Sequence, residues 1–321
     1  MTYFDCFNGD ADGICALTQL RRHTPRNATL VTGVKRDISL LKQIVDKVEP
    51  GDVVTVLDVS MDKNKSELDQ ILAAGAKVFY CDHHFAGEIP TDVSLECIIN
   101  TTANVCTSLL INQHLNSDFL GWGVVGTFGD NLDASATSLA KPLGLTQEEL
   151  TQFKNLGVYL NYNGYGAALA DLYFHPADLY QKTAQYDKPE QFINEDKDTY
   201  NTLEQGYYSD MQNAQAVKAD FSNEAAAVFV LPDAPWARRV SGVYGNELAN
   251  QHVDRAHAVV TQADTNNYLI SVRAPLNNKK GADEICRQFA TGGGRAAAAG
   301  INALPKSELP KFIDTLAQYY S

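Results

Sequence analysis

The sequence lacks an excess of basic residues. Its 321 residues include 26 Lys and Arg against 39 Asp and Glu, which gives a net charge of −13 at pH 7. Affinity for long nucleic acids comes mainly from Lys and Arg side chains that neutralise many phosphates. The composition therefore argues against a long nucleic acid as the main partner. It favours a small phosphorylated ligand held by a few Arg side chains and metal ions.

Long apolar runs and cysteine motifs are also missing. No stretch approaches the roughly 18 consecutive apolar residues that a membrane span requires. The first residues, MTYFDCFNGDADG, carry acidic side chains where a signal peptide has a basic and then an apolar region. We therefore expect a cytoplasmic protein without a membrane partner. The six cysteines form no C-x-x-C pair, which predicts reduced and mostly buried thiols.

The pattern of apolar runs predicts an α/β fold with two domains. In residues 1–130 short apolar runs alternate with helical stretches, as in DVVTVLDVS followed by KSELDQILAAGA. This alternation is typical of a parallel sheet with helices on both faces. Strand patterns return near residue 221 and predict a smaller α/β domain. We assign residues 1–190 to the first domain, 191–220 to a helical linker, and 221–321 to the second domain.

Acidic and histidine residues follow several of the expected strands. The run from Asn8 to Gly13 contains Asp10 and Asp12 at a junction between strand and loop, Asp58 ends VVTVLD, and Asp82 opens the run Asp82-His83-His84. Ligands bind parallel sheets beyond the carboxyl ends of the strands. Carboxylates with an imidazole suit Mn²⁺ or Mg²⁺, and carboxylates that converge without a cation would repel one another. A fifth acidic residue, Asp130, follows the run WGVVG, whose pattern fits a strand or a helix.

The order of these motifs resembles the DHH phosphoesterase family. The matching residues are D-x-D-G at Asp10, the lone Asp58, the D-H-H run from Asp82 and the later Asp130. The C-terminal residues Ser271-Val272-Arg273 and Gly292-Gly293-Gly294-Arg295 are similar to the companion DHHA1 domain. The resemblance covers nearly the whole chain. It implies a Mn²⁺-dependent hydrolase of phosphodiesters or phosphomonoesters.

The resemblance also implies a role for each residue. Asp10 and Asp58 would hold a first metal ion, and a second ion would be held by Asp12, Asp58, His83 and Asp130. His84 would face the substrate as a phosphate ligand or general acid. Asp82 would orient the two histidines, because ligand imidazoles usually donate their other N–H to a carboxylate.

Two positions depart from the family pattern. Cys6 stands where many members have a histidine ligand of the first metal, and a thiolate matches Mn²⁺ poorly. We expect Cys6 to be a buried strand residue, with Asn8 or water as the replacement ligand. Arg295 stands where the family usually has histidine. The Gly292–Gly294 run reads either as a plain cap of an Ala-rich helix or as a cradle of backbone N–H groups at a helix N-terminus. Arg295 and Arg273 would then bind phosphate or stack on a base.

Three functions remain open from the sequence. The first is a phosphodiesterase that hydrolyses short linear oligonucleotides or dinucleotides, such as pGpG or nano-RNA, with two Mn²⁺ ions (Mg²⁺ as the alternative). The second is a phosphomonoesterase for a nucleotide such as 3′-phosphoadenosine 5′-phosphate. The third is a catalytically silent nucleotide-binding module. A homodimer is left open, as is the role of the run from Asn161 to Gly166, a helix break or a loop over the site.

Overall fold

The computed structural model describes residues 1–321 and divides them into two compact units, Met1–Gln205 and Gly206–Ser321. The division falls inside helix α9 (Lys197–Gln215), which runs through the predicted linker. The domain limits drawn from the sequence stay a prediction. No helix is long and apolar enough to cross a membrane.

The first unit contains a five-stranded sheet in which every neighbouring pair is parallel. The strands lie in the order β2 (Thr29–Val31), β1 (Tyr3–Phe7), β3 (Val53–Leu57), β4 (Lys77–Asp82) and β5 (Leu95–Ile99). From β1 the chain adds β2 on one side of the sheet and then β3 on the other side. The loops after β1 and β3 therefore leave neighbouring strand ends. In parallel sheets such a point is where ligands bind.

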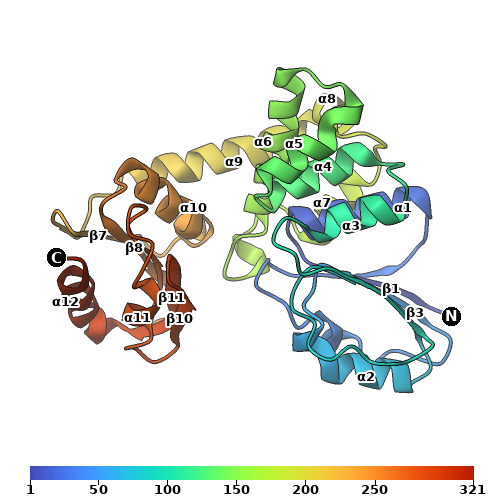
Figure 1. The fold of residues 1–321 in the computed structure, drawn as a ribbon, viewed down its shortest axis with the longest axis horizontal. Helices are drawn as coiled ribbons and strands as arrows, with labels where there is room; N and C mark the ends of the chain where they lie inside the picture. The colour runs from blue at the N-terminus through green and yellow to red at the C-terminus, as the bar shows by residue number, and fades with distance from the viewer. The chain divides into compact units, whose positions relative to one another are not determined.

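Helices cover both faces of this sheet, as the sequence predicts. On one face lie α1 (Ala11–His23) and α3 (Thr107–His114) (Figure 1). On the other, the short helix η1 (Leu40–Gln43) and α2 (Lys65–Ala73) pack apolar side chains onto the strands. Cys6 packs in the core on this second face and is completely buried. It is thus the buried strand residue that the sequence predicts.

Further helices complete the first unit. Their bounds are α4 (Leu120–Gly129), α5 (Asp133–Ala140), α6 (Gln147–Asn163), α7 (Pro176–Thr183) and α8 (Pro189–Glu195). The run WGVVG, which the sequence left between strand and helix, lies in α4. The glycines of α4 have a packing role, because their lack of a side chain lets the helix lie close to its neighbours. A Cβ at Gly126 would lie 2.3 Å from the Ser108 hydroxyl, and one at Gly129 would lie 2.2 Å from Ala11 Cβ.

The second unit contains a six-stranded mixed sheet. The strands lie in the order β10 (Gly292–Arg295), β11 (Ala298–Pro305), β9 (Asn267–Arg273), β8 (Ala256–Gln262), β7 (Ala226–Val230) and β6 (Phe221–Ser222). Only β7 and β8 pair in parallel, and α10 (Pro235–Gln251) connects them. Side chains from α10 cover one face, and α11 (Ala282–Cys286) and α12 (Leu309–Tyr320) cover the other. The predicted α/β class is confirmed for both units.

The prediction that a helix begins at the glycine run is wrong. Gly292–Arg295 is strand β10, and it forms an antiparallel hairpin with β11, so no helix begins there. The alanines after Arg295 suggested a helix, but β11 is the strand that pairs with β9, and tertiary pairing outweighs local helix propensity. A helix N-terminus therefore cannot supply the anion cradle expected at this run.

Candidate metal centre

Asp10 and Asp12 are placed by the start of helix α1 rather than by a loop. Asp10 is the N-cap residue, and its side chain accepts a hydrogen bond from the backbone N–H of Gly13 at 3.1 Å. Asp12 lies in the first turn of the helix and is 1% exposed. Acidic residues suit this place, because a helix N-terminus carries partial positive charge.

Asp12 is held from a second helix as well. Its Oδ2 accepts a hydrogen bond from the backbone N–H of Thr107 at 2.8 Å, and its Oδ1 accepts one from Ser108 at 2.6 Å. These donors are the first residues of α3. The carboxylate therefore joins α1 to the N-terminus of α3, and both its oxygens are fixed in position.

Asp58 follows β3 in a strained conformation. Its φ is 58°, in the left-handed region that residues other than glycine rarely adopt. The side chain is 2% exposed, and its Oδ1 accepts a hydrogen bond from the Thr107 hydroxyl at 3.3 Å. Such strain persists only where the surroundings enforce it, and it is concentrated at functional sites.

His83 stands among three carboxylates. Its Nε2 lies 3.4 Å from Asp58 Oδ1, 3.8 Å from Asp12 Oδ2 and 3.9 Å from Asp130 Oδ2. Ligands at about 2.1 Å from an octahedral cation are about 3 Å apart, so each of these carboxylate oxygens lies only slightly farther from His83 Nε2 than two ligands of one ion would. We call this set the His83 position: Asp12, Asp58, His83 and Asp130.

The electrostatics of the His83 position fit a cation. Burial, and then the repulsion of Asp12 and Asp10, raises the pKa of Asp58 well above its ordinary value. Burial followed by the same two carboxylates raises the pKa of Asp130 to about 7. Burial raises the pKa of Asp12 too, although His83 opposes the rise. A divalent cation would remove this repulsion, and hard oxygen donors with one imidazole suit Mn²⁺ or Mg²⁺.

His84 and Asp82 form a pair beside these carboxylates. His84 Nδ1 lies 2.8 Å from Asp82 Oδ1, at the end of β4, and 3.9 Å from Asp58 Oδ1. The hydrogen bond to Asp82 raises the pKa of His84, against the opposing effect of burial. Asp82 is completely buried, whereas the His84 side chain is 46% exposed. This arrangement leaves His84 Nε2 available to hold a proton toward a bound molecule.

Lys35 is a residue of the centre that the sequence did not indicate. Its Nζ donates to Asp10 Oδ2 at 2.6 Å and to Asn161 Oδ1 at 2.8 Å. Burial lowers the pKa of Lys35, but Asp10 and other neighbours outweigh it and the net shift is upward. Lys35 lies in the loop after β2, a strand with no acidic residue at its end, so no local pattern marked it. Asn161 belongs to α6, which continues to Asn163, so this part of the Asn161–Gly166 run is helical.

Asn8 is partly consistent with its predicted role as a ligand. It is 5% exposed, and its Nδ2 donates to the Lys35 carbonyl at 3.3 Å. Its Oδ1 is buried without a hydrogen-bond partner. Asn8, Asp10 and Asp58 form the set that we call the Asp10 position, where the resemblance implies the first metal.

The candidate residues of the second unit have different surroundings. Arg273 ends β9, where its guanidinium donates to Asn246 Oδ1 at 2.6 Å and to the Ser271 hydroxyl at 3.0 Å. Arg295 is exposed at the end of β10. Gly294 has a φ of 139°, and a Cβ at Gly292 would lie 1.8 Å from the Cys286 carbonyl oxygen, so both need glycine. Around Gly293 there is nothing within 4 Å of an added Cβ, so packing does not explain its lack of a side chain.

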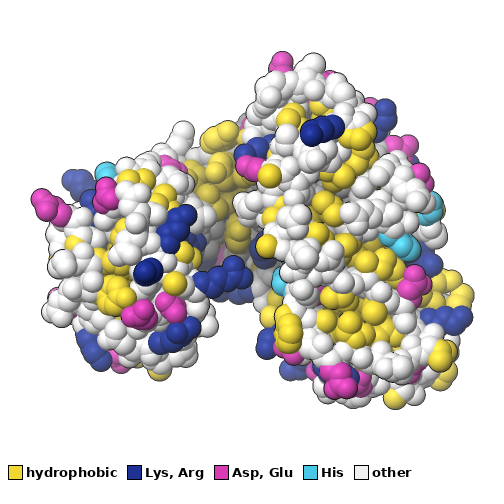
Figure 2. Space-filling model, viewed as in Figure 1, with side chains coloured by type: hydrophobic (Ala, Val, Ile, Leu, Met, Phe, Trp, Pro, Cys, Tyr) yellow, Lys and Arg dark blue, Asp and Glu magenta, His cyan; other side chains and the backbone are white.

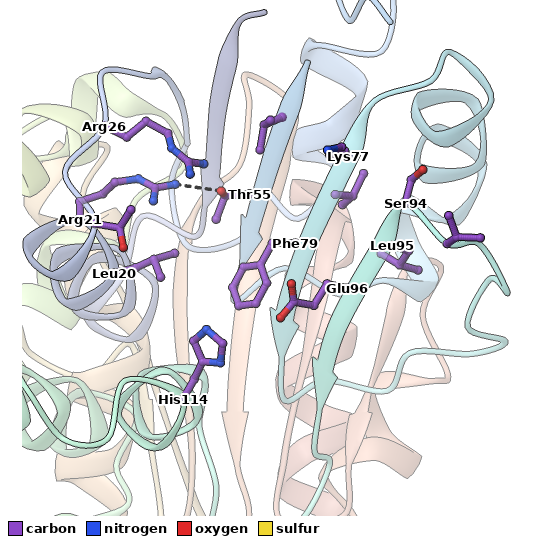
Figure 3. Close-up of a pocket in the computed structure, with 14 residues that line it drawn as sticks. Leu20, Arg21, Arg26, Thr55, Lys77, Phe79, Ser94, Leu95, Glu96 and His114 are labelled. Carbon is purple, nitrogen blue, oxygen red and sulfur yellow. Dashed lines mark hydrogen bonds between the residues drawn. The ribbon is translucent and has the colours of Figure 1, made fainter. Parts of the chain in front are cut away.

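A pocket of about 650 Å³ lies elsewhere on the first unit. Its lining includes the first residues of β3, β4 and β5, so it lies at the amino ends of the strands, whereas the acidic residues lie at the carboxyl ends. Arg21 donates to the Thr55 hydroxyl there, and Phe79 lies beside His114 (Figure 3). None of the predicted site residues lines this pocket.

Solved structures with the same fold were found, whereas no protein-family model and no curated protein matches the sequence. Exonuclease RecJ bound to manganese aligns with a TM-score of 0.65 and 15% identity over 99% of this chain and 90% of its own. RecJ from Thermus thermophilus in complex with Mn²⁺ aligns with a TM-score of 0.63 and 16% identity, over 99% of this chain and 52% of its own. The pGpG-specific phosphodiesterase PggH from Vibrio cholerae gives a TM-score of 0.56 and 13% identity over 100% and 99%.

The fold is of the DHH type. In this DHH-type fold the carboxyl ends of the parallel strands and the start of α1 bring Asp10, Asp12, Asp58 and Asp82–His84 together, and the end of α4 adds Asp130. The fold that the resemblance implied is thus confirmed.

Proposed function

We propose that this protein is a Mn²⁺-dependent phosphodiesterase that hydrolyses short linear oligonucleotides or dinucleotides, such as pGpG or nano-RNA, to mononucleotides. The observation that carries the proposal is the His83 position, where three carboxylates each lie within 4 Å of one imidazole nitrogen. The fold shared with the manganese-bound exonuclease and the pGpG phosphodiesterase supports the same assignment.

The residues of the centre have complementary roles in this proposal. The residues of the His83 position would hold a divalent cation, which would supply Lewis acidity toward a phosphoryl oxygen and would lower the pKa of a water molecule. Asp12 and Asp58 hold their oxygens in place before any ligand arrives, because backbone and hydroxyl donors fix them. His84, oriented by Asp82, donates a hydrogen bond to the phosphate or a proton to the leaving oxygen.

The surface charge supports a short substrate. On the face shown in Figure 2, basic and acidic side chains are interspersed and neither sign covers a whole unit. With a net charge of −13, the chain offers a long polyanion little overall attraction. We propose that Arg295 and Gly293 of the second unit bind the nucleotide, since one is an exposed cation and the other lets a ligand approach the backbone.

One assay distinguishes this function from its alternatives. The purified protein with Mn²⁺ is given labelled pGpG, a longer RNA, a cyclic dinucleotide and 3′-phosphoadenosine 5′-phosphate in separate reactions. Mononucleotide released from pGpG, with the longer RNA left intact, supports the proposal. Phosphate released from the bisphosphate alone would instead establish a phosphomonoesterase. Binding without turnover of any substrate would establish a silent binding module.

A further inference from the structure

The Asp10 position contains a cation that belongs to the chain itself. Lys35 Nζ contacts Asp10 Oδ2 at 2.6 Å, and Asp58 is close enough to contribute to the electrostatics of the same ammonium group. The other oxygen of Asp10 is used by the backbone N–H of Gly13. Both oxygens of the carboxylate therefore have donors from the protein.

The position of Lys35 is fixed by several contacts. Its backbone N–H donates to the Gly164 carbonyl at 2.8 Å, and its own carbonyl accepts from Asn8 Nδ2 at 3.3 Å. Its Nζ lies 2.8 Å from Asn161 Oδ1 and 5.7 Å from the centre of the Tyr165 ring. The ammonium is thus held on the side of Asp10 by elements that converge from β1, the loop after β2 and the end of α6.

The donors left for a metal ion at the Asp10 position are few. Every group of three acidic or histidine ligand atoms that lie within 4.8 Å of one another includes His83, and none includes Asp10. Cys6 is buried in the apolar core, and burial raises the pKa of its thiol, so it supplies no thiolate ligand. The buried Asn8 Oδ1 is the one neutral donor without a partner. While Lys35 pairs with Asp10, both oxygens of that carboxylate have protein donors, so the position offers a metal ion only Asn8 Oδ1 and Asp58, which also belongs to the His83 position.

We propose that the Lys35 ammonium occupies the place of the first metal ion, so that the centre binds a single divalent cation at the His83 position. The inference rests on the metal-binding part of the proposed function and replaces the two ions expected from the sequence. Lys35 neutralises Asp10 next to Asp58, as an ion would. An ammonium has three N–H donors, and Asp10 and Asn161 use two, which leaves one for a phosphoryl oxygen of the substrate.

The test is the number of Mn²⁺ ions bound per chain. The metal-free full chain is titrated with Mn²⁺ by calorimetry, the bound metal is counted by mass spectrometry after desalting, and the electron paramagnetic resonance spectrum is recorded. We expect one ion per chain and the spectrum of an isolated Mn²⁺ ion. Two ions per chain, or the spectrum of an exchange-coupled pair, would overturn the inference while leaving the proposed function intact. No bound Mn²⁺ would defeat both.

Two variants connect the count to Lys35. Lys35→Ala removes the ammonium and leaves Asp10 beside Asp58, so we expect it to bind two ions and give a coupled spectrum. Lys35→Arg keeps the charge and should bind one ion like the parent chain. A single ion in the alanine variant would show that Lys35 does not set the count, which refutes the inference. The count on the parent chain decides the matter even if the alanine variant fails to fold.

Discussion

Replacing Asp130 by asparagine should stabilise the protein without metal, and most of this advantage over the parent should disappear when Mn²⁺ is present. Burial and the charges of Asp12 and Asp10 raise the pKa of Asp130 from its ordinary value of 3.8 to about 7. Each pKa unit corresponds to about 1.4 kcal/mol, so full ionisation of Asp130 in the metal-free fold costs about 4 kcal/mol. Water reaches 21% of the side chain, and we expect a measured effect of about 2–4 kcal/mol.

The sign of the pH dependence follows from the direction of the shift. Between pH 3.8 and about 7 the folded chain keeps a proton on Asp130 that the unfolded chain releases. This group therefore makes the metal-free parent lose stability as the pH rises through that range. Asparagine does not titrate, so the advantage of Asp130→Asn should be about 1 kcal/mol near pH 5 and reach its full value near pH 8.

Manganese should remove most of this advantage. An ion at about 100 times its Kd stabilises the parent by about 2.7 kcal/mol. If losing one carboxylate ligand raises Kd about 100-fold, the same Mn²⁺ concentration stabilises the variant by only about 0.4 kcal/mol. The gain from added Mn²⁺ should thus be much smaller in the variant.

Urea unfolding measures these differences in the first unit alone. In a Trp236→Phe background, Trp122 is the one remaining tryptophan, and it is completely buried in the first unit. Asp133→Asn is the matched control, because Asp133 is exposed and pairs only with Lys154; we expect a change within about 0.5 kcal/mol. A metal-free Asp130→Asn chain that is less stable than its parent near pH 8 would refute the repulsion argument.

Four further substitutions address catalysis and substrate binding. Asp58→Ala should abolish hydrolysis of pGpG, because the carboxylate closest to His83 is lost; full activity would mean that the metal assignment is wrong. Asp82→Asn should lower the pKa of His84, since its hydrogen bond is the main cause of the upward shift, so activity that needs protonated His84 should decline at lower pH than in the parent; an unchanged kcat/KM–pH profile would exclude this role. Arg295→Ala and Gly293→Ala should chiefly raise KM, whereas an equal fall in kcat would place these residues in the transition state.

Gly293 offers a clear separation of binding from folding. Added bulk at Gly293 meets nothing within 4 Å, so Gly293→Ala should unfold at the same urea concentration as the parent. Gly292→Ala is the contrasting variant, because its Cβ would overlap the Cys286 carbonyl oxygen and should destabilise the hairpin. A Gly293→Ala chain with unchanged KM would remove this glycine from the proposed binding surface.

The sequence predicted the parts of the centre that are encoded locally. Apolar strand patterns that end in Asp58 and Asp82 predict where these two residues lie, because the carboxyl ends of parallel strands meet at one edge of the sheet. Asp130 reaches the same place from the end of a helix, which its apolar run alone could not distinguish from a strand. Lys35 carries no such signal. It enters the centre because Gly164, Asn161 and Asn8 hold it there, and those contacts exist only in the folded chain.

The prediction of a helix where β10 and β11 lie is wrong for a related physical reason. Local helix propensity of an alanine run is a weak preference, and pairing with β9 decides the conformation of these residues. The glycines before it were correctly singled out. Gly292 and Gly294 need glycine for steric reasons, whereas packing does not explain the glycine at position 293.

The attachment of Asp12 to α3 has a consequence for reading related chains. Its two oxygens accept the backbone N–H groups of Thr107 and Ser108, so the carboxylate completes a helix end that would otherwise lie buried and unsatisfied. A descendant that abandoned hydrolysis would still need Asp12 for its architecture. Retention of this aspartate is therefore poor evidence of activity. Asp130 and His84 support no helix in this way, so the loss of either residue would be better evidence that a related chain is no longer catalytic.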